Sequence, residues 1–84
     1  MDTLSEIIKI TNNPDLKEAI ESEIANCMMG QSNVDEKIVT ENYLEGFLAV
    51  FLPYGTKEES DDLAGRAYTE GVNDGQHYKD EGKL

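Results

Sequence analysis

The sequence has few of the features by which disulfide-rich, exported or membrane proteins are identified. Cys27 is the only cysteine, so no intrachain disulfide framework can form, which is expected in a reducing, cytoplasmic compartment. No basic segment leads into an apolar run near the first residues. No apolar stretch reaches the length of a membrane span. We therefore expect a small cytoplasmic protein that does not enter a membrane.

Motifs of catalysis and of cofactor binding are missing as well. There is no phosphate-binding glycine loop, no nucleophile elbow and no zinc-ligand spacing. His77 is the only histidine and has no cysteine near it with which to bind a metal. Cys27 lies on an apolar helical stripe beside Met28, where an inert core thiol is expected. We predict a protein that is not an enzyme and has no catalytic residue, metal site or cofactor.

Basic residues are scarce relative to acidic ones. The 84 residues include 18 acidic and 7 basic side chains, which gives a formal net charge of −11. Such a surface repels nucleic-acid phosphate and anionic membranes, and it attracts basic protein surfaces. High net charge also serves solubility in many small proteins. The composition therefore leaves two alternatives, in which the acidity either recognises a basic partner or only solvates the surface.

The most apolar stretch covers residues 38–52, with the sequence IVTENYLEGFLAVFL. On a helix its apolar side chains cover more than half the circumference, and only Glu41, Asn42 and Glu45 form a polar seam. A helix with so wide an apolar surface needs neighbours on several sides. We therefore predict an all-α fold, a small bundle of about four short helices around one central apolar helix.

Capping residues divide the chain into its helical segments. A capping box, with threonine followed three residues later by glutamate, occurs at residues 3–6 and 56–59. Pro14 after Asn13 is typical of a helix start, and Pro53 ends the central helix. The single domain, residues 1–84, is predicted to have helices near residues 4–10, 14–29, 34–52 and 57–73.

The end of the last helix is predicted from a polar residue and two glycines. Asp74 would interrupt the apolar stripe, so we expect the helix to end around residues 73–75 and residues 76–84 to form a mobile tail. Gly71 and Gly75 follow Ala67 at intervals of four residues. They either form a smooth ridge for a helix of another chain, or Gly71 packs inside the monomer while Gly75 ends the helix.

The apolar positions of the helices predict the core and an assembly state. The central helix has more apolar surface than three short neighbouring helices can easily cover. A homodimer, in which a second copy covers the rest, is therefore an alternative to the monomer. The residues predicted to form the core are Leu16, Ile20, Ile24, Leu44, Phe47, Leu48, Phe51, Leu63, Ala67 and Val72.

Acidic residues gather at the start of the last helix and along one face of the second. They are either a helix cap and a solvated face, or an array that imitates phosphate and occupies a nucleic-acid-binding groove of another protein. Two tyrosines near the first cluster are candidates for the anchors that such an interface needs. The predicted partner-binding residues are Glu58, Glu59, Asp61, Asp62, Tyr54, Tyr68, Asp15, Glu18 and Glu21.

Two segments resemble known inhibitor families. Residues 3–8, TLSEII, resemble the opening of the phage uracil-DNA glycosylase inhibitors, which are acidic DNA mimics of similar length. Short acidic helices followed by residues 51–54, FLPY, look like the immunity proteins of nuclease colicins. Each likeness covers one segment and implies a class of function without membership of the family. We therefore predict a non-catalytic inhibitor of a basic, nucleic-acid-handling protein, in the manner of phage counter-defence or immunity proteins. The alternative is a self-associating structural or adaptor protein.

Overall fold

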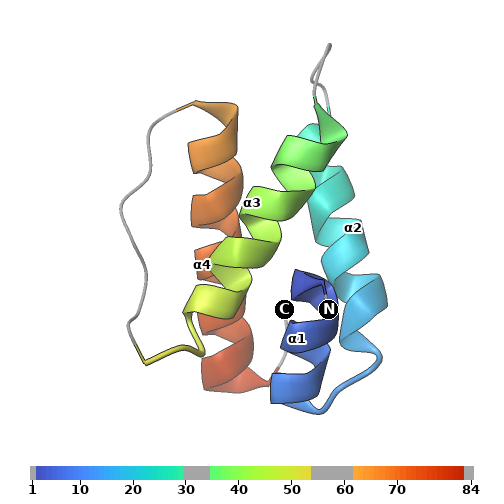
Figure 1. Cartoon of the computed structure of the whole chain (residues 1–84), viewed down its shortest axis with the longest axis vertical. Coiled ribbons are helices and arrows are strands. Elements are labelled where there is room, and N and C mark those ends of the chain that lie inside the picture. The colour runs from blue at the N-terminus through green and yellow to red at the C-terminus, as the bar shows by residue number, and fades with distance from the viewer. Residues whose placement is uncertain (1, 30–34, 54–61, 83–84) are drawn as a thin grey trace.

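The part of the chain that the structure describes is a bundle of four helices, α1 (Thr3–Thr11), α2 (Leu16–Met28), α3 (Glu36–Ala49) and α4 (Leu63–Glu81). The computed structural model describes residues 2–29, 35–53 and 62–82, and these ranges contain no strand. Figure 1 shows α3 in the middle, with α2 and α4 on its two sides and α1 across one end. The predicted all-α bundle with one central helix is confirmed. No helix in the described ranges combines the length and hydropathy needed to cross a membrane.

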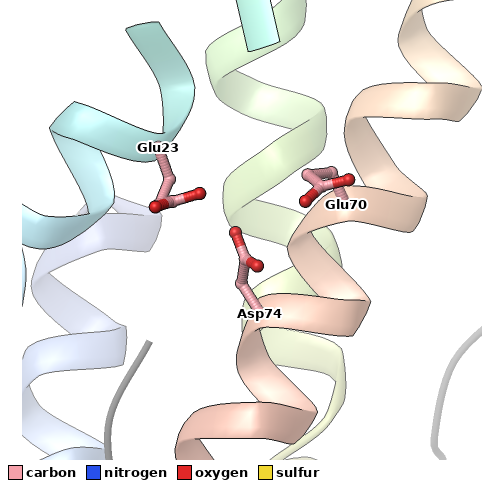
Figure 2. Close-up of side chains that lie close together, drawn as sticks. All are labelled: Glu23, Glu70 and Asp74. Atoms are coloured by element: carbon pink, nitrogen blue, oxygen red, sulfur yellow. The ribbon is translucent and has the colours of Figure 1, made fainter. Parts of the chain in front are cut away.

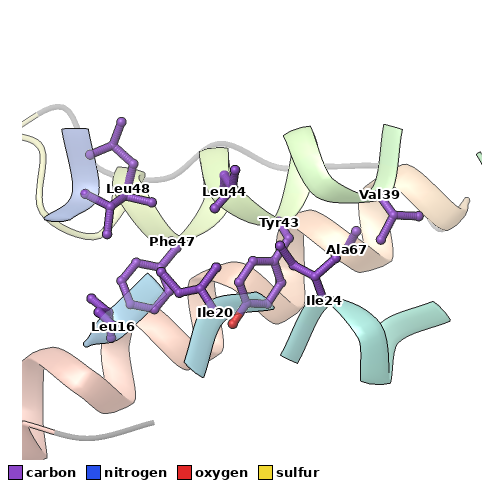
Figure 3. Close-up of a cluster of buried hydrophobic side chains, with 10 residues drawn as sticks. Leu16, Ile20, Ile24, Val39, Tyr43, Leu44, Phe47, Leu48 and Ala67 are labelled. Carbon is purple, nitrogen blue, oxygen red and sulfur yellow. The ribbon is translucent and has the colours of Figure 1, made fainter. Parts of the chain in front are cut away.

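The core forms around α3, which contacts each of the other three helices. Phe47 and Tyr43 are the largest fully buried side chains of α3, and both belong to the buried cluster that also contains Ile20 and Ile24 of α2 (Figure 3). A helix that buries most of its circumference has low amphipathicity, which is why its sequence has no single apolar stripe. The wide apolar surface predicted for residues 38–52 is therefore covered largely by the chain itself.

Most of the predicted core is buried in the structure. The three exceptions are Phe51, Leu63 and Val72, which are partly buried. Five further residues lie in the interior, although the sequence patterns did not assign them to the core. These five are Ile7, Val39, Tyr43, Ala49 and Tyr68.

Glycines allow the backbones of α3 and α4 to touch where the helices cross. A Cβ atom at Gly46 would overlap the backbone carbonyl oxygen of Tyr68, and one at Gly71 would overlap that of Tyr43. The backbone of each helix thus packs directly against a glycine of the other helix. Only a residue without a side chain fits at these two positions. Of the two alternatives for Gly71, the structure shows packing inside the monomer.

The expected end of the last helix at residues 73–75 is wrong, because α4 continues to Glu81. Asp74 does not interrupt the helix, since its carboxylate accepts a hydrogen bond from a buried tyrosine of α3. Gly75 does not end it either. It is buried against α3, where a Cβ atom would lie 2.9 Å from the carbonyl oxygen of Phe47. Most of the segment expected to form a mobile tail is therefore helical.

Tyr78 attaches the final turns of α4 to the rest of the bundle. Its ring centroid lies 6.2 Å from that of Phe47 and 6.4 Å from that of Phe51. Its hydroxyl accepts a hydrogen bond of 3.1 Å from the side-chain amide of Asn13. The helix then ends at Gly82, whose φ of 74° places it in the left-handed region that favours glycine.

The structure also revises where the helices start. The carboxylate of Asp2, rather than Thr3, caps α1 by accepting from the amide of Ser5 at 2.8 Å. Asp35 caps α3 by accepting from the amides of residues 37 and 38, and Asp62 caps α4. Aspartate is among the strongest caps, and each of these three precedes its helix directly. The capping box predicted at residues 56–59 lies outside the described residues.

Candidate functional site

Three carboxylates face one another across the space between α2 and α4. Figure 2 shows Glu23 extending from α2 toward Glu70 and Asp74 of α4. One carboxylate oxygen from each of the three residues lies within 4.8 Å of the other two. Glu70 and Asp74 are four residues apart and so share one face of α4. We call these three residues the carboxylate cluster.

Tyr43 of α3 forms the buried side of this cluster. Its side chain is fully buried, and its hydroxyl donates a hydrogen bond to Asp74. Burial raises the pKa of Tyr43, and the hydrogen bond to Asp74 raises it further. The hydroxyl therefore stays protonated and remains a donor, which holds one member of the cluster in place.

The cluster favours a bound proton on Glu23. Partial burial raises the pKa of the Glu23 carboxyl, and the negative charges of Asp74 and Glu70 add to the effect. A protonated Glu23 is placed to donate its proton to Asp74. No lysine or arginine within the described ranges forms an ion pair with these carboxylates. The arrangement is therefore suited to sharing a proton or to receiving positive charge from outside.

Cys27 lies near the same cluster on α2. Its thiol is half-buried, and burial, together with the charges of Glu70, Asp74 and Glu23, raises its pKa from 9.0 to about 11. A thiol with so high a pKa is almost entirely protonated at neutral pH and is a poor nucleophile. The structure thus agrees with the prediction of an inert thiol.

Carboxylate oxygens are also the ligands that hard cations prefer. The cluster offers three such side chains, whereas calcium and magnesium take about six or more oxygens. The rest of a coordination shell would have to come from water. This cluster was not predicted, because the separation of Glu70 and Asp74 is its only local signal in the sequence. Glu23 joins them only through the packing of α2 beside α4.

We expect replacement of Glu23 by glutamine to stabilise the protein at neutral pH but not at acidic pH. Folding raises the pKa of Glu23 above its usual 4.5, so the folded chain keeps a proton that the unfolded chain releases. The contribution of this group to stability is thus complete below about pH 4.5 and is lost as the pH rises through the folded-state pKa. Glutamine does not titrate, so the advantage of the variant should grow as the pH rises.

Urea unfolding of both proteins across this pH range measures the effect. Glu21→Gln is the matched control, because Glu21 is exposed on the same helix and its replacement removes the same charge. An equal gain in both variants would mean that net charge, and not the cluster, sets the difference. A gain that does not change with pH would contradict the proton on Glu23.

Five of the nine predicted partner-binding residues lie within the described ranges. Asp15, Glu18 and Glu21 are exposed on α2, as expected. Asp62 is exposed at the start of α4 and accepts from the amide of Gly65 at 2.8 Å. The remaining members of the first predicted cluster, Tyr54, Glu58, Glu59 and Asp61, lie outside the described residues.

Tyr68 does not have the exposed position that an interface anchor needs. Only 3% of its surface is exposed, because it lies on the buried side of α4. Tyr68 is near the acidic residues of the helix start in the sequence, which suggested an interface anchor, whereas its spacing from the apolar residues of α4 is typical of a buried side chain. In this structure Tyr68 belongs to the interior.

Comparison with protein families, with curated proteins and with solved structures found no match to this chain. Its function is therefore argued from charge and geometry alone.

Proposed function

We propose that this protein binds a basic surface of a partner protein and blocks a site that handles nucleic acid. The supporting observation is that no described lysine or arginine forms an ion pair with the acidic side chains of α1, α2 and α3. Apart from Glu23, which is partly buried, all of them within the described ranges are exposed. The one contact of this kind between described residues lies on α4, where Nδ1 of His77 is 3.0 Å from a carboxylate oxygen of Glu81. The negative charge of the other three helices is thus left for a partner to neutralise.

A nucleic-acid-handling partner fits this charge because its own ligand is a polyanion. A surface that binds phosphate has a positive potential, and carboxylates fixed on a small helical domain present the same sign of charge as phosphate. Electrostatic complementarity of this kind speeds association and selects the partner more than it adds affinity. Inhibition then follows from occupying the site that the nucleic acid would use.

A second candidate function is self-association as a structural or adaptor protein. Within the described ranges three large apolar side chains remain exposed, Ile10 by 45%, Met29 by 74% and Ile38 by 43%. Exposed apolar surface favours contacts between protein copies. The net charge of −11 opposes such contacts, because identical copies repel one another. Ionic strength separates the two functions, since salt weakens binding to a basic partner but favours contact between like-charged copies.

Neutralising the acidic face of α2 is expected to slow association with the partner. The variant changes Asp15 to asparagine and Glu18 and Glu21 to glutamine. The partner is first captured from lysate at low salt and purified, and its association rate and nucleic-acid binding are then measured. We expect a roughly tenfold lower association rate for the variant, because charges at the rim of an interface act mainly on this rate. Raising the salt from about 50 to about 200 mM should lower the wild-type rate in the same way.

The matched control removes three charges that do not lie on α2. It changes Glu6 and Glu45 to glutamine and Asp80 to asparagine, which are exposed on α1, α3 and α4. Equal slowing in both variants would assign the effect to total charge rather than to this face of α2. If the captured protein binds nucleic acid equally well in the presence of this protein, the inhibitor proposal is wrong.

A further inference from the structure

A groove of about 700 Å³ lies where the start of α1 meets the first half of α3. Leu4 of α1 and Leu44 of α3 line it; Leu44 is buried and Leu4 partly buried. They form its apolar base, whereas the charged residues that line it are exposed and form its margin. These are Asp2, Glu36, Lys37 and Glu41.

The groove follows from the lengths and placement of the two helices. α1 has 9 residues and α3 has 14. Figure 1 shows α1 beside the lower end of α3, so the first turns of α3 extend beyond the start of α1. Lys37, Glu41 and Leu44 follow one another at intervals of four and three residues and so share one face of α3. Lys37, Glu41 and Leu44 therefore line the groove from one face of α3, opposite Leu4 of α1.

Three carboxylates and one ammonium group give the margin a negative charge. The carboxylate of Asp2 is fixed in place, because it accepts a hydrogen bond of 2.8 Å from the amide of Ser5. That hydrogen bond also holds the pKa of Asp2 below its usual value. Glu36 and Glu41 stand on either side of Lys37 along α3, and Lys37 forms no ion pair with them within the described ranges.

We propose that this groove binds a short basic, amphipathic segment of the partner protein. An apolar side chain of that segment would cover Leu4 and Leu44, and lysines or arginines beside it would meet Asp2, Glu36 and Glu41. The volume lies within the roughly 300–1,000 Å³ typical of ligand sites, which suits one or two turns of a helix rather than a whole domain. A basic segment fits better than a second copy of this chain, because two copies would bring their negative margins together.

This inference rests on the proposed function for the existence of a basic partner, and it adds where that partner is held. The test uses two synthetic peptides of identical leucine and lysine composition. In one, the leucines follow a helical spacing and form a single stripe; in the other, the same residues are scrambled. Both are titrated into the isotope-labelled protein and followed by NMR. We expect the striped peptide to bind with shift changes centred on Leu4, Thr40 and Leu44, and to bind at least tenfold more tightly than the scrambled peptide.

A pair of charge reversals on α3 provides the control. Glu41→Lys should lower the affinity of the protein for the striped peptide at least tenfold, whereas Glu45→Lys should change this affinity less than about twofold. Both residues are exposed on α3, and only Glu41 lines the groove. Three results would overturn the inference. They are equal loss of peptide affinity in both variants, shift changes centred outside the groove, and no binding at about 1 mM peptide.

The captured partner separates this inference from the proposed function. If the partner binds the Glu41→Lys variant as fast as the wild type, the groove is not its site, although the proposed function stands. If no basic partner is captured while the striped peptide still binds as expected, the groove is a peptide site and the proposed function fails.

Discussion

Phe47→Ala is expected to lower the free energy of unfolding by about 3–5 kcal/mol, which is enough to unfold much of a domain of this size. The side chain is fully buried at the centre of α3. Its ring centroid lies 6.4 Å from that of Tyr43, 5.8 Å from that of Phe51 and 6.2 Å from that of Tyr78. Truncation therefore removes contacts with three aromatic rings and leaves a cavity where α3 and α4 meet.

Urea unfolding followed by circular dichroism measures this loss. Ile38→Ala is the matched control, since Ile38 lies on the same helix but has 43% of its surface exposed. The control should change the stability by about 0.5 kcal/mol or less. A loss below about 1 kcal/mol for Phe47→Ala would mean that α3 is rotated relative to its position in the structure.

The central helix could be predicted from the sequence because its signal is a property of one segment. A wide apolar surface between Asp35 and Pro53 is typical of a helix with neighbours on several sides, and the structure confirms this role. Helix starts were less accurate. Any of several neighbouring aspartate, serine, threonine or asparagine residues can cap a helix, and packing selects among them.

The length of α4 could not be predicted, because the reason for it lies in another helix. Asp74 is polar at a position where the stripe of α4 requires an apolar residue. Its partner, the hydroxyl of Tyr43, is 31 residues away in the sequence. Gly71 and Gly75 are unfavourable in a helix by about 1 kcal/mol each, and the backbone of α3 provides the compensating contact. Local patterns therefore favoured an early helix end that the tertiary contacts override.

The carboxylate cluster shows the same limit for a candidate site. The separation of Glu70 and Asp74 indicates a shared face on one helix, as it does for many solvated acidic pairs. Glu23 completes the cluster only after α2 and α4 have packed against α3. Charge composition could be read from the sequence, whereas the burial that raises the pKa of Glu23 depends on the fold.

Gly71→Ala is expected to destabilise the protein by about 2 kcal/mol or more, although alanine is the better helix former. The gain in helix propensity is about 1 kcal/mol. The added methyl group would overlap the carbonyl oxygen of Tyr43 and lie 2.9 Å from the amide nitrogen of Phe47. Both are backbone atoms of α3, so relief requires the two helices to move apart. Overpacking of this kind typically costs about 1–3 kcal/mol, and more where backbone must shift.

Asn73→Ala provides the comparison, because Asn73 is exposed two residues further along α4 and its replacement adds no methyl group to the crossing. It should be neutral or slightly stabilising, since alanine favours the helix. Thermal unfolding should therefore separate the variants clearly, because about 1 kcal/mol corresponds to roughly 4–8 °C in a domain of this size. If Gly71→Ala unfolds at or above the wild-type temperature, α3 and α4 do not pack backbone to backbone at this glycine. Gly71 would then return as a candidate for the ridge that another chain contacts.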